Sequence, residues 1–143
     1  MKPEGSFPRI EEILARVLRA KGKASEVLTD KEAASLGDAY LNFAYSTAQS
    51  LREGKPRGLR LDNRVLAEAV KKAGLRGKLP KRLSRREIGG AAEALLAYAT
   101  ARGMLSAWEL IEGLTAGSRE SLAGSLARLL SEAYRRLEEA EEG

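Results

Sequence analysis

The chain has 143 residues, a length that suits one domain with one hydrophobic core, and we treat residues 1–143 as a single domain. It contains neither cysteine nor histidine, which excludes disulfides, thiolate nucleophiles, Ser-His-Asp triads and the usual zinc sites. Its net charge is +5, no apolar run is long enough to span a bilayer, and no signal-peptide pattern opens it. We therefore expect a cytoplasmic protein that neither spans nor binds a membrane.

Charged residues are unevenly distributed along the chain. The segment 52–87 holds thirteen Lys or Arg against four Asp or Glu, a local charge of +9, so the rest of the chain carries −4. A concentrated basic segment indicates a polyanion partner, but it also suits a solvated surface, and charge alone leaves both open. Asn, Gln and Met are scarce while Glu, Lys and Arg are plentiful, which is typical of a thermophile protein.

Residues 1–8 look like a loose lead-in, and helical periodicity dominates the apolar pattern from about residue 9 onward. It predicts a first helix over 9–21, which Gly22 would end. The other predicted helices, in chain order, are a short turn within 23–28 and helices over 31–52, 63–73, 85–101, 107–114 and 119–141. We find no convincing strand and no internal repeat. The predicted fold class is therefore all-α, a bundle of about six helices.

Capping signals mark the starts of four of these helices. The capping side chains are Thr29 or Asp30, Asp62, Ser84 followed by Glu87, and Ser106 followed by Glu109. Gly103 is expected just past the C-terminus of the 85–101 helix. The segment 78–83, between two of the long helices, is predicted to be a basic loop.

Two of the predicted helices, 31–52 and 85–101, each carry one acid within an apolar stretch. The acid is Asp38 in the stretch 33–44 and Glu93 in the stretch 88–99. A helix that is apolar on most sides is normally buried, so we expect both helices at the centre of the bundle. A carboxylate in such a place must be paired, hydrogen-bonded or bound to a metal, because an isolated buried charge is very costly.

Small residues surround both acids. Gly37 precedes Asp38 although glycine costs a helix about 1 kcal/mol relative to alanine, which suggests the close approach of another backbone. The small residues at 89–92 would likewise let a partner helix come close to Glu93. Asn42, one turn after Asp38, could orient a ligand there or hydrogen-bond another helix. Taken singly, each acid also fits a structural ion pair.

These stretches resemble a known family. The segment 36–42, Leu-Gly-Asp-Ala-Tyr-Leu-Asn, resembles the Gly-Asp-Ala signature helix of the ribonuclease III catalytic domain. The segment 92–96 resembles the second acidic motif of that family, and 63–75 resembles its intermediate helix. The likeness covers roughly residues 30–103. The chain looks most like the short archaeal ribonuclease III-like proteins and the Mini-ribonuclease III branch.

The resemblance implies an activity and a site. Family members are homodimers of all-α subunits whose carboxylates hold magnesium, which activates a water to attack a phosphodiester of double-stranded RNA. This implies a hydrolase, an endoribonuclease acting on double-stranded or structured RNA, with Mg²⁺ or Mn²⁺ as cofactor. Asp38 and Glu93 would be the catalytic metal ligands. Five basic residues would contact RNA phosphates: Lys78, Lys81, Arg82, Arg85 and Arg86.

The chain departs from the family pattern at two positions. Ala34 stands four residues before Asp38, where family enzymes usually have Glu, and Gly90 stands three residues before Glu93, where they usually have Asp. The alternative is therefore a catalytically inactive RNA-binding or assembly subunit with the same fold. A purely structural dimerisation module is a third reading, against which the lone acids argue. We expect no double-stranded RNA-binding domain after the last helix, as in the Mini branch.

Overall fold

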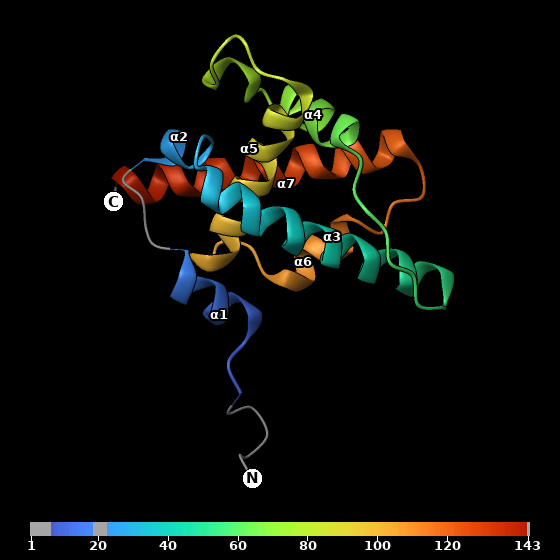
Figure 1. Ribbon diagram of the computed structural model, residues 1–143. Coiled ribbons are helices and arrows are strands. Elements are labelled where there is room, and N and C mark those ends of the chain that lie inside the picture. Colours follow the sequence, from blue (N-terminus) through green and yellow to red (C-terminus); the bar gives the residue numbers. More distant parts are fainter. Residues whose placement is uncertain (1–6, 19–22, 143) are drawn as a thin grey trace.

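The computed structural model describes residues 7–18 and 23–142. Within these ranges the chain is all-α, and no strand occurs there (Figure 1). The helices are α1 (Ile10–Val17), α2 (Ala24–Val27), α3 (Lys31–Glu53), α4 (Asn63–Lys72), the 3₁₀ helix η1 (Arg76–Lys78), α5 (Arg85–Ala101), α6 (Ala107–Gly113) and α7 (Arg119–Glu142). The predicted class is confirmed, and α3 to α7 begin at the residues that the sequence predicts.

Most predicted helix ends agree with the structure to within one residue, but two predicted segments differ from it in kind. α1 ends at Val17 because Leu18 leaves the helical region, with φ −101° and ψ 96°. The rest of the predicted first helix, with its stop at Gly22, lies outside the described residues. The basic loop predicted at 78–83 is partly helical at its start, since η1 extends to Lys78.

The predicted caps are present. Asp30 and Asp62 accept hydrogen bonds from backbone N–H groups in the first turns of α3 and α4. Ser84 and Ser106 each form a capping box with the glutamate three residues later. Gly103 follows α5 with φ 73°, a left-handed conformation that glycine adopts at little cost. These contacts are local, which is why the sequence could predict the helix starts.

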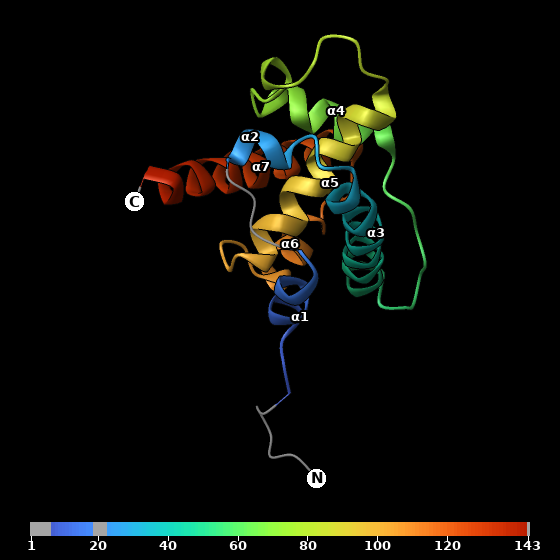
Figure 2. The same cartoon turned by 60° about the vertical axis from the view of Figure 1, so that its left-hand side comes forward.

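α5 is the central helix of the bundle. Every residue from 91 to 100 is buried, and α5 packs against α1, α2, α3, α4 and α7. Figures 1 and 2, which differ by a rotation of 60°, both place α5 among these helices. Its alanines let neighbours approach closely on several sides, and its leucines fill the spaces between them. The predicted central position of this helix is confirmed.

α3 lies beside α5 with one face open to solvent. It packs on α5 and α6, but the side chains of Phe43 and Leu51 are 54% and 60% exposed. The prediction that both acid-bearing helices are central is therefore right for α5 and wrong for α3. The physical reason is that no described segment of this chain covers Phe43, in the middle of α3, or Leu51, in its last turn.

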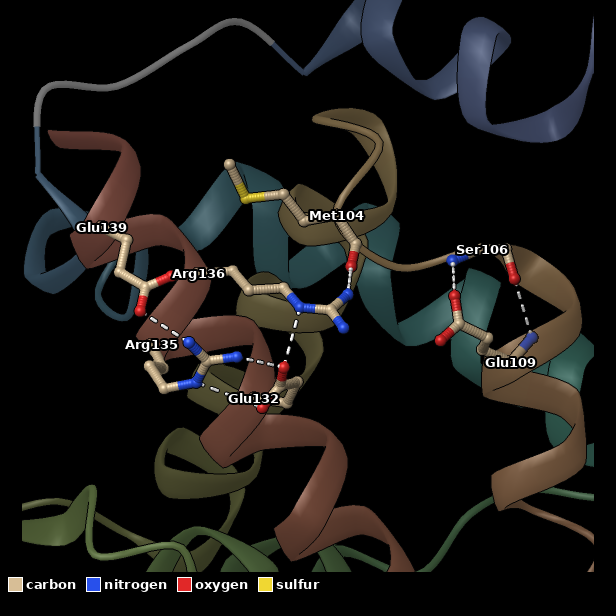
Figure 3. A network of polar contacts seen from close by, with 7 residues as sticks. All are labelled: Met104, Ser106, Glu109, Glu132, Arg135, Arg136 and Glu139. Atoms are coloured by element: carbon tan, nitrogen blue, oxygen red, sulfur yellow. Dashed lines mark hydrogen bonds and ion pairs between the residues drawn. The ribbon is translucent and has the colours of Figure 1, made fainter. Parts of the chain in front are cut away.

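α7 packs on α4 and α5 and is also held by polar contacts near its end. Arg136 donates hydrogen bonds to Glu132 and to the carbonyl of Met104, which lies in the connection between α5 and α6 (Figure 3). Arg135 pairs with Glu132 and Glu139 on the surface. Exposed ion pairs add little stability one by one, so the bond to Met104 is the contact that ties this connection to α7.

The connection between α3 and α4 runs back along α3 as an extended strap, residues 57–61 (Figure 1). Three α3 side chains spaced four residues apart accept hydrogen bonds from alternate N–H groups of the strap: Ser50 from Arg57 (2.8 Å), Ser46 from Leu59 (2.8 Å) and Asn42 from Leu61 (2.7 Å). Four helical residues rise about 6 Å and two extended residues about 6.6 Å, so the two spacings match. The strap is thereby fixed to the outside of α3.

Candidate functional site

α3 and α5 approach each other most closely beside the two acids. A Cβ on Gly37 would lie 2.2 Å from the backbone carbonyl oxygen of Glu93, a distance that real Cβ atoms do not adopt. Only glycine fits at residue 37 unless the backbones move apart. The close approach predicted from Gly37 is confirmed, and it brings Asp38 next to Glu93.

The two acids lie in one cleft of about 620 Å³, between α3, the strap, α4 and α5. Asp38 and Glu93 both line it, so the acids of the two motifs meet as the sequence predicts. Ala34 and Gly90 line the same cleft, and a Cβ on Gly90 would lie 3.6 Å from the Cβ of Ala34. All four positions at which the family pattern places acids therefore converge here, although only two of them hold carboxylates in this chain.

Glu93 is the buried member of the pair, with 8% of the residue exposed. Burial, followed by the hydrogen bond and the like charge of Asp38, raises the pKa of Glu93 to about 8. The charges of Arg86 and Arg60 act in the opposite direction without cancelling this effect. Without a bound cation, Glu93 therefore holds its proton at neutral pH. A cation between the two carboxyls would favour the ionised form.

Asp38 lies at the mouth of the cleft, with 46% of its side chain exposed. Asn42 donates a hydrogen bond to Oδ1 of Asp38 (3.0 Å), and the guanidinium of Arg60 lies 3.7 Å from Oδ2. The expectation of a buried acid is thus wrong for Asp38, because this side of α3 opens to solvent. Asn42 bonds the strap rather than another helix, and its bond from Leu61 fixes the amide that orients Asp38.

Of the five basic residues predicted to contact RNA, the structure brings Arg86 alone into the lining of the cleft. Lys78 lies over the ring of a tyrosine in α7, 5.2 Å from its centre. Lys81, Arg82 and Arg85 are exposed on the loop before α5 and on its first residue, outside the cleft lining. Their contact with phosphates stays a prediction.

Two cations that the sequence reasoning missed, Lys31 and Arg60, also line the cleft. Lys31 precedes Asp38 by seven residues, and two helical turns bring such residues to the same side of a helix. That spacing could have predicted that Lys31 lies on the same side of the helix as Asp38. Arg60 had no such signal, because its place depends on the hydrogen bonds between the strap and α3.

The donors of this cleft suit one hard divalent cation. Magnesium keeps several waters and is commonly bound by one or two carboxylates together with substrate phosphates, and Asp38 with Glu93 supplies two. Within the described part of the chain, no group of three or more His, Cys, Asp or Glu side chains is placed to hold a metal. The described residues of this chain therefore do not by themselves supply the carboxylates of a site that holds two ions.

A comparison with protein-family models matches residues 31–139 to the model described as Ribonuclease III. The matched span is most of the chain and includes both acids and the whole strap. The chain belongs to the ribonuclease III family. A comparison with curated proteins finds no match.

The match confirms the resemblance to this family and makes RNA the expected substrate. The ribonuclease III family generally uses a divalent metal, in keeping with the oxygen donors of the cleft. The match is to the family as a whole, so the archaeal and Mini branches stay predictions. Among the described helices, none combines the length and the apolar character needed to cross a membrane.

Proposed function

We propose that this ribonuclease III-family chain is a metal-dependent endoribonuclease that hydrolyses phosphodiesters of double-stranded or structured RNA. The observation that carries the proposal is the meeting of Asp38 and Glu93 in one cleft, which three cations and the helix-capping acids Asp30 and Glu87 also line. Two acids alone would repel a polyanion. Acids for a metal beside cations for phosphates are the combination that phosphodiester hydrolysis requires.

Asp38 and Glu93 would hold one Mg²⁺ or Mn²⁺. When bound, the ion supplies Lewis-acid assistance and offsets negative charge in the transition state. Glu93 would release its proton as the ion enters, since burial and Asp38 otherwise keep the carboxyl neutral. Asn42 would keep Asp38 aimed into the cleft through its hydrogen bond to Oδ1.

The cations of the cleft, above all Lys31 and Arg86, would bind the RNA backbone, because A-form RNA is recognised chiefly through its shape, phosphates and 2′-hydroxyls. The exposed residues Lys78, Lys81, Arg82 and Arg85 would extend this basic surface beyond the cleft. Binding of this kind carries little base preference and weakens with salt.

A homodimer belongs to the proposal, but it would not use residues 91–100 of α5, which this chain buries by itself. Large apolar side chains are exposed instead on and just before α1 (Phe7, Ile10, Ile13, Val17), on α3 (Phe43, Leu51) and on α6 (Trp108). α1 and α6 adjoin, since Glu11 accepts a hydrogen bond from the backbone N–H of Ala107 (2.7 Å). Large apolar side chains exposed in this way favour association of two copies, for which a two-fold axis is the commonest arrangement.

The second candidate is a non-catalytic RNA-binding or assembly subunit, and the residues at 34 and 90 favour it. Ala34 and Gly90 leave the cleft with two of the four acids that family enzymes usually have. The three cations of the cleft would still bind RNA in such a subunit. The two candidates differ in one observable, which is cutting.

Incubating a long RNA duplex with the purified protein tests the proposal. We expect cutting in magnesium or manganese and none in excess chelator, with single-stranded RNA and duplex DNA as comparison substrates. Binding of the duplex without cutting under any divalent metal would contradict the enzyme and support the second candidate.

A further inference from the structure

We propose that Arg60 is a phosphate-binding residue, held beside the acid pair by the strap, and that it pairs with Asp38 only while no RNA is bound. The inference rests on the proposed function, since it takes RNA as the ligand. It adds a residue from the strap, outside the basic loop and the helices that carry the acids.

The backbone around Arg60 is fixed on both sides. Its neighbours Leu59 and Leu61 donate backbone N–H hydrogen bonds to Ser46 (2.8 Å) and Asn42 (2.7 Å), and Leu61 is also buried. The side chain of Arg60 itself is 81% exposed. A fixed backbone with a solvated side chain lets the guanidinium change partners without moving the strap.

The contact between Arg60 and Asp38 is weak enough to exchange. At 3.7 Å it is longer than a hydrogen bond, and the carboxylate is half exposed. Exposed ion pairs contribute little to stability. A phosphate can instead accept two parallel bonds from a guanidinium, a stronger arrangement. A divalent ion on Asp38 would weaken the contact further by neutralising the carboxylate.

The contact with Asp38 places the guanidinium of Arg60 near the position that a phosphate in the cleft would occupy. Arg60 lines the cleft together with both acids, and its charge reaches Glu93, since it lowers the pKa of that carboxyl. A phosphodiester that approached a metal held by Asp38 and Glu93 would therefore meet the guanidinium at the mouth. Lys31 and Arg86 come from α3 and α5, so Arg60 adds a cation from a third element.

Arg57 provides a matched control on the same strap. It carries the same charge, is also exposed, and pairs with Glu53 at 2.8 Å, yet it does not line the cleft. Its bonds to Ser50 use backbone atoms, so Arg57→Ala leaves the strap attached to α3. The two arginines thus differ mainly in their place relative to the acids.

The test measures binding of a blunt RNA duplex by fluorescence anisotropy over a series of salt concentrations, with calcium in place of magnesium. We expect Arg60→Ala to bind about tenfold more weakly than the parent, and its slope of log affinity against log salt to fall by about one. Arg57→Ala should stay within about twofold of the parent, which is the scatter expected of a rim charge. Arg60→Lys should keep the slope but recover only part of the affinity, because lysine lacks the planar fork.

Equal losses in Arg57→Ala and Arg60→Ala, or parental binding by Arg60→Ala, would overturn the inference and leave Arg60 as a counter-ion of Asp38. These outcomes are separable from failure of the proposed function. A parent that binds duplex RNA without cutting it would contradict the enzyme, while the affinity series would still decide the role of Arg60. If the parent cuts duplex RNA and Arg60→Ala binds it normally, the proposed enzyme is supported and the role of Arg60 is contradicted.

Discussion

The backbone carbonyl oxygen of Glu93 lies 2.2 Å from the position that a Cβ on Gly37 would occupy. α3 and α5 therefore meet here with no side chain of residue 37 between them. Asp38 is the next residue on α3, so this backbone approach sets how near its carboxyl comes to that of Glu93. The geometry of the acid pair depends on a glycine as much as on the acids.

Gly37→Ala should destabilise the protein and reduce cutting. The added methyl would meet backbone atoms that cannot move aside by rotation. Overpacking of this kind costs about 1–3 kcal/mol, more than the roughly 1 kcal/mol that alanine gains in helix propensity. Urea unfolding measures the change. Gly90→Ala is the control, because its Cβ would make an ordinary 3.6 Å contact, and we expect it to be neutral or stabilising. Equal effects of the two substitutions would contradict the account.

Placing acids at residues 34 and 90, where the chain departs from the family pattern, should strengthen metal binding. Ala34 and Gly90 lie next to each other in the lining of the cleft that holds Asp38 and Glu93. The double variant Ala34→Glu with Gly90→Asp would then offer four carboxylates, and we expect its affinity for Mn²⁺ to rise by about tenfold or more, since ligand charge tunes such sites. Calorimetric titration measures this without relying on activity. The variant Ala34→Gln with Gly90→Asn has the same sizes without the charges and should show no gain.

Protein stability should fall as pH rises from about 5 to about 8. The pKa of Glu93 is about 8 in the folded protein against an ordinary value of 4.5, so between these values the folded state binds a proton that the unfolded state lacks. Deprotonation of Glu93 therefore lowers the free energy of unfolding by at most about 5 kcal/mol as the pH rises to 8. The chain has no histidine side chain to add a transition in this window.

Unfolding in urea at about pH 5 and about pH 8.5 measures this slope, and Glu93→Gln is the comparison. Glutamine cannot ionise, so the free energy of unfolding of the variant should change less with pH. At the higher pH the variant should be more stable than the parent. Saturating magnesium should reduce the slope of the parent, because the ion favours the charged carboxyl. Identical slopes in parent and variant would show that Glu93 titrates normally.

The exposed apolar side chains should mediate a dimer. Trp108 on α6 is 58% exposed and Ile13 on α1 is 47% exposed. We expect light scattering to report a dimer for the parent, and the double variant Trp108→Ser with Ile13→Ser to shift it toward monomer while circular dichroism stays helical. A parent that is monomeric at micromolar concentration would rule out this interface.

Local signals explain what could be predicted from the sequence. Asp30, Asp62, Ser84 and Ser106 cap their own helices through contacts within three residues, so the starts of α3 to α6 needed no knowledge of the rest of the fold. α5 is apolar on most sides, which favoured a central position. Gly37 carried the signal for the close approach of α5.

Features that depend on distant segments could not be predicted in the same way. Apolar periodicity places Phe43 on a face of α3 but does not say whether this chain covers that face. The half-exposure of Asp38, on another side of α3, likewise depends on which distant segments cover that side. Arg60 reaches the cleft because a strap nineteen residues beyond Asn42 returns to bond it, at Leu61, and no motif marks that return.

The most direct test of the central claim compares the parent with Asp38→Asn and Glu93→Gln. Both substitutions keep size and remove the ability to carry a negative charge, so both variants should fold and should bind an RNA duplex in calcium much as the parent does. In magnesium, gel-resolved cutting of a long RNA duplex should fall by at least about a hundredfold in each variant, because the metal would lose a ligand. Cutting by both variants at the parental rate would contradict the account and make these two acids structural.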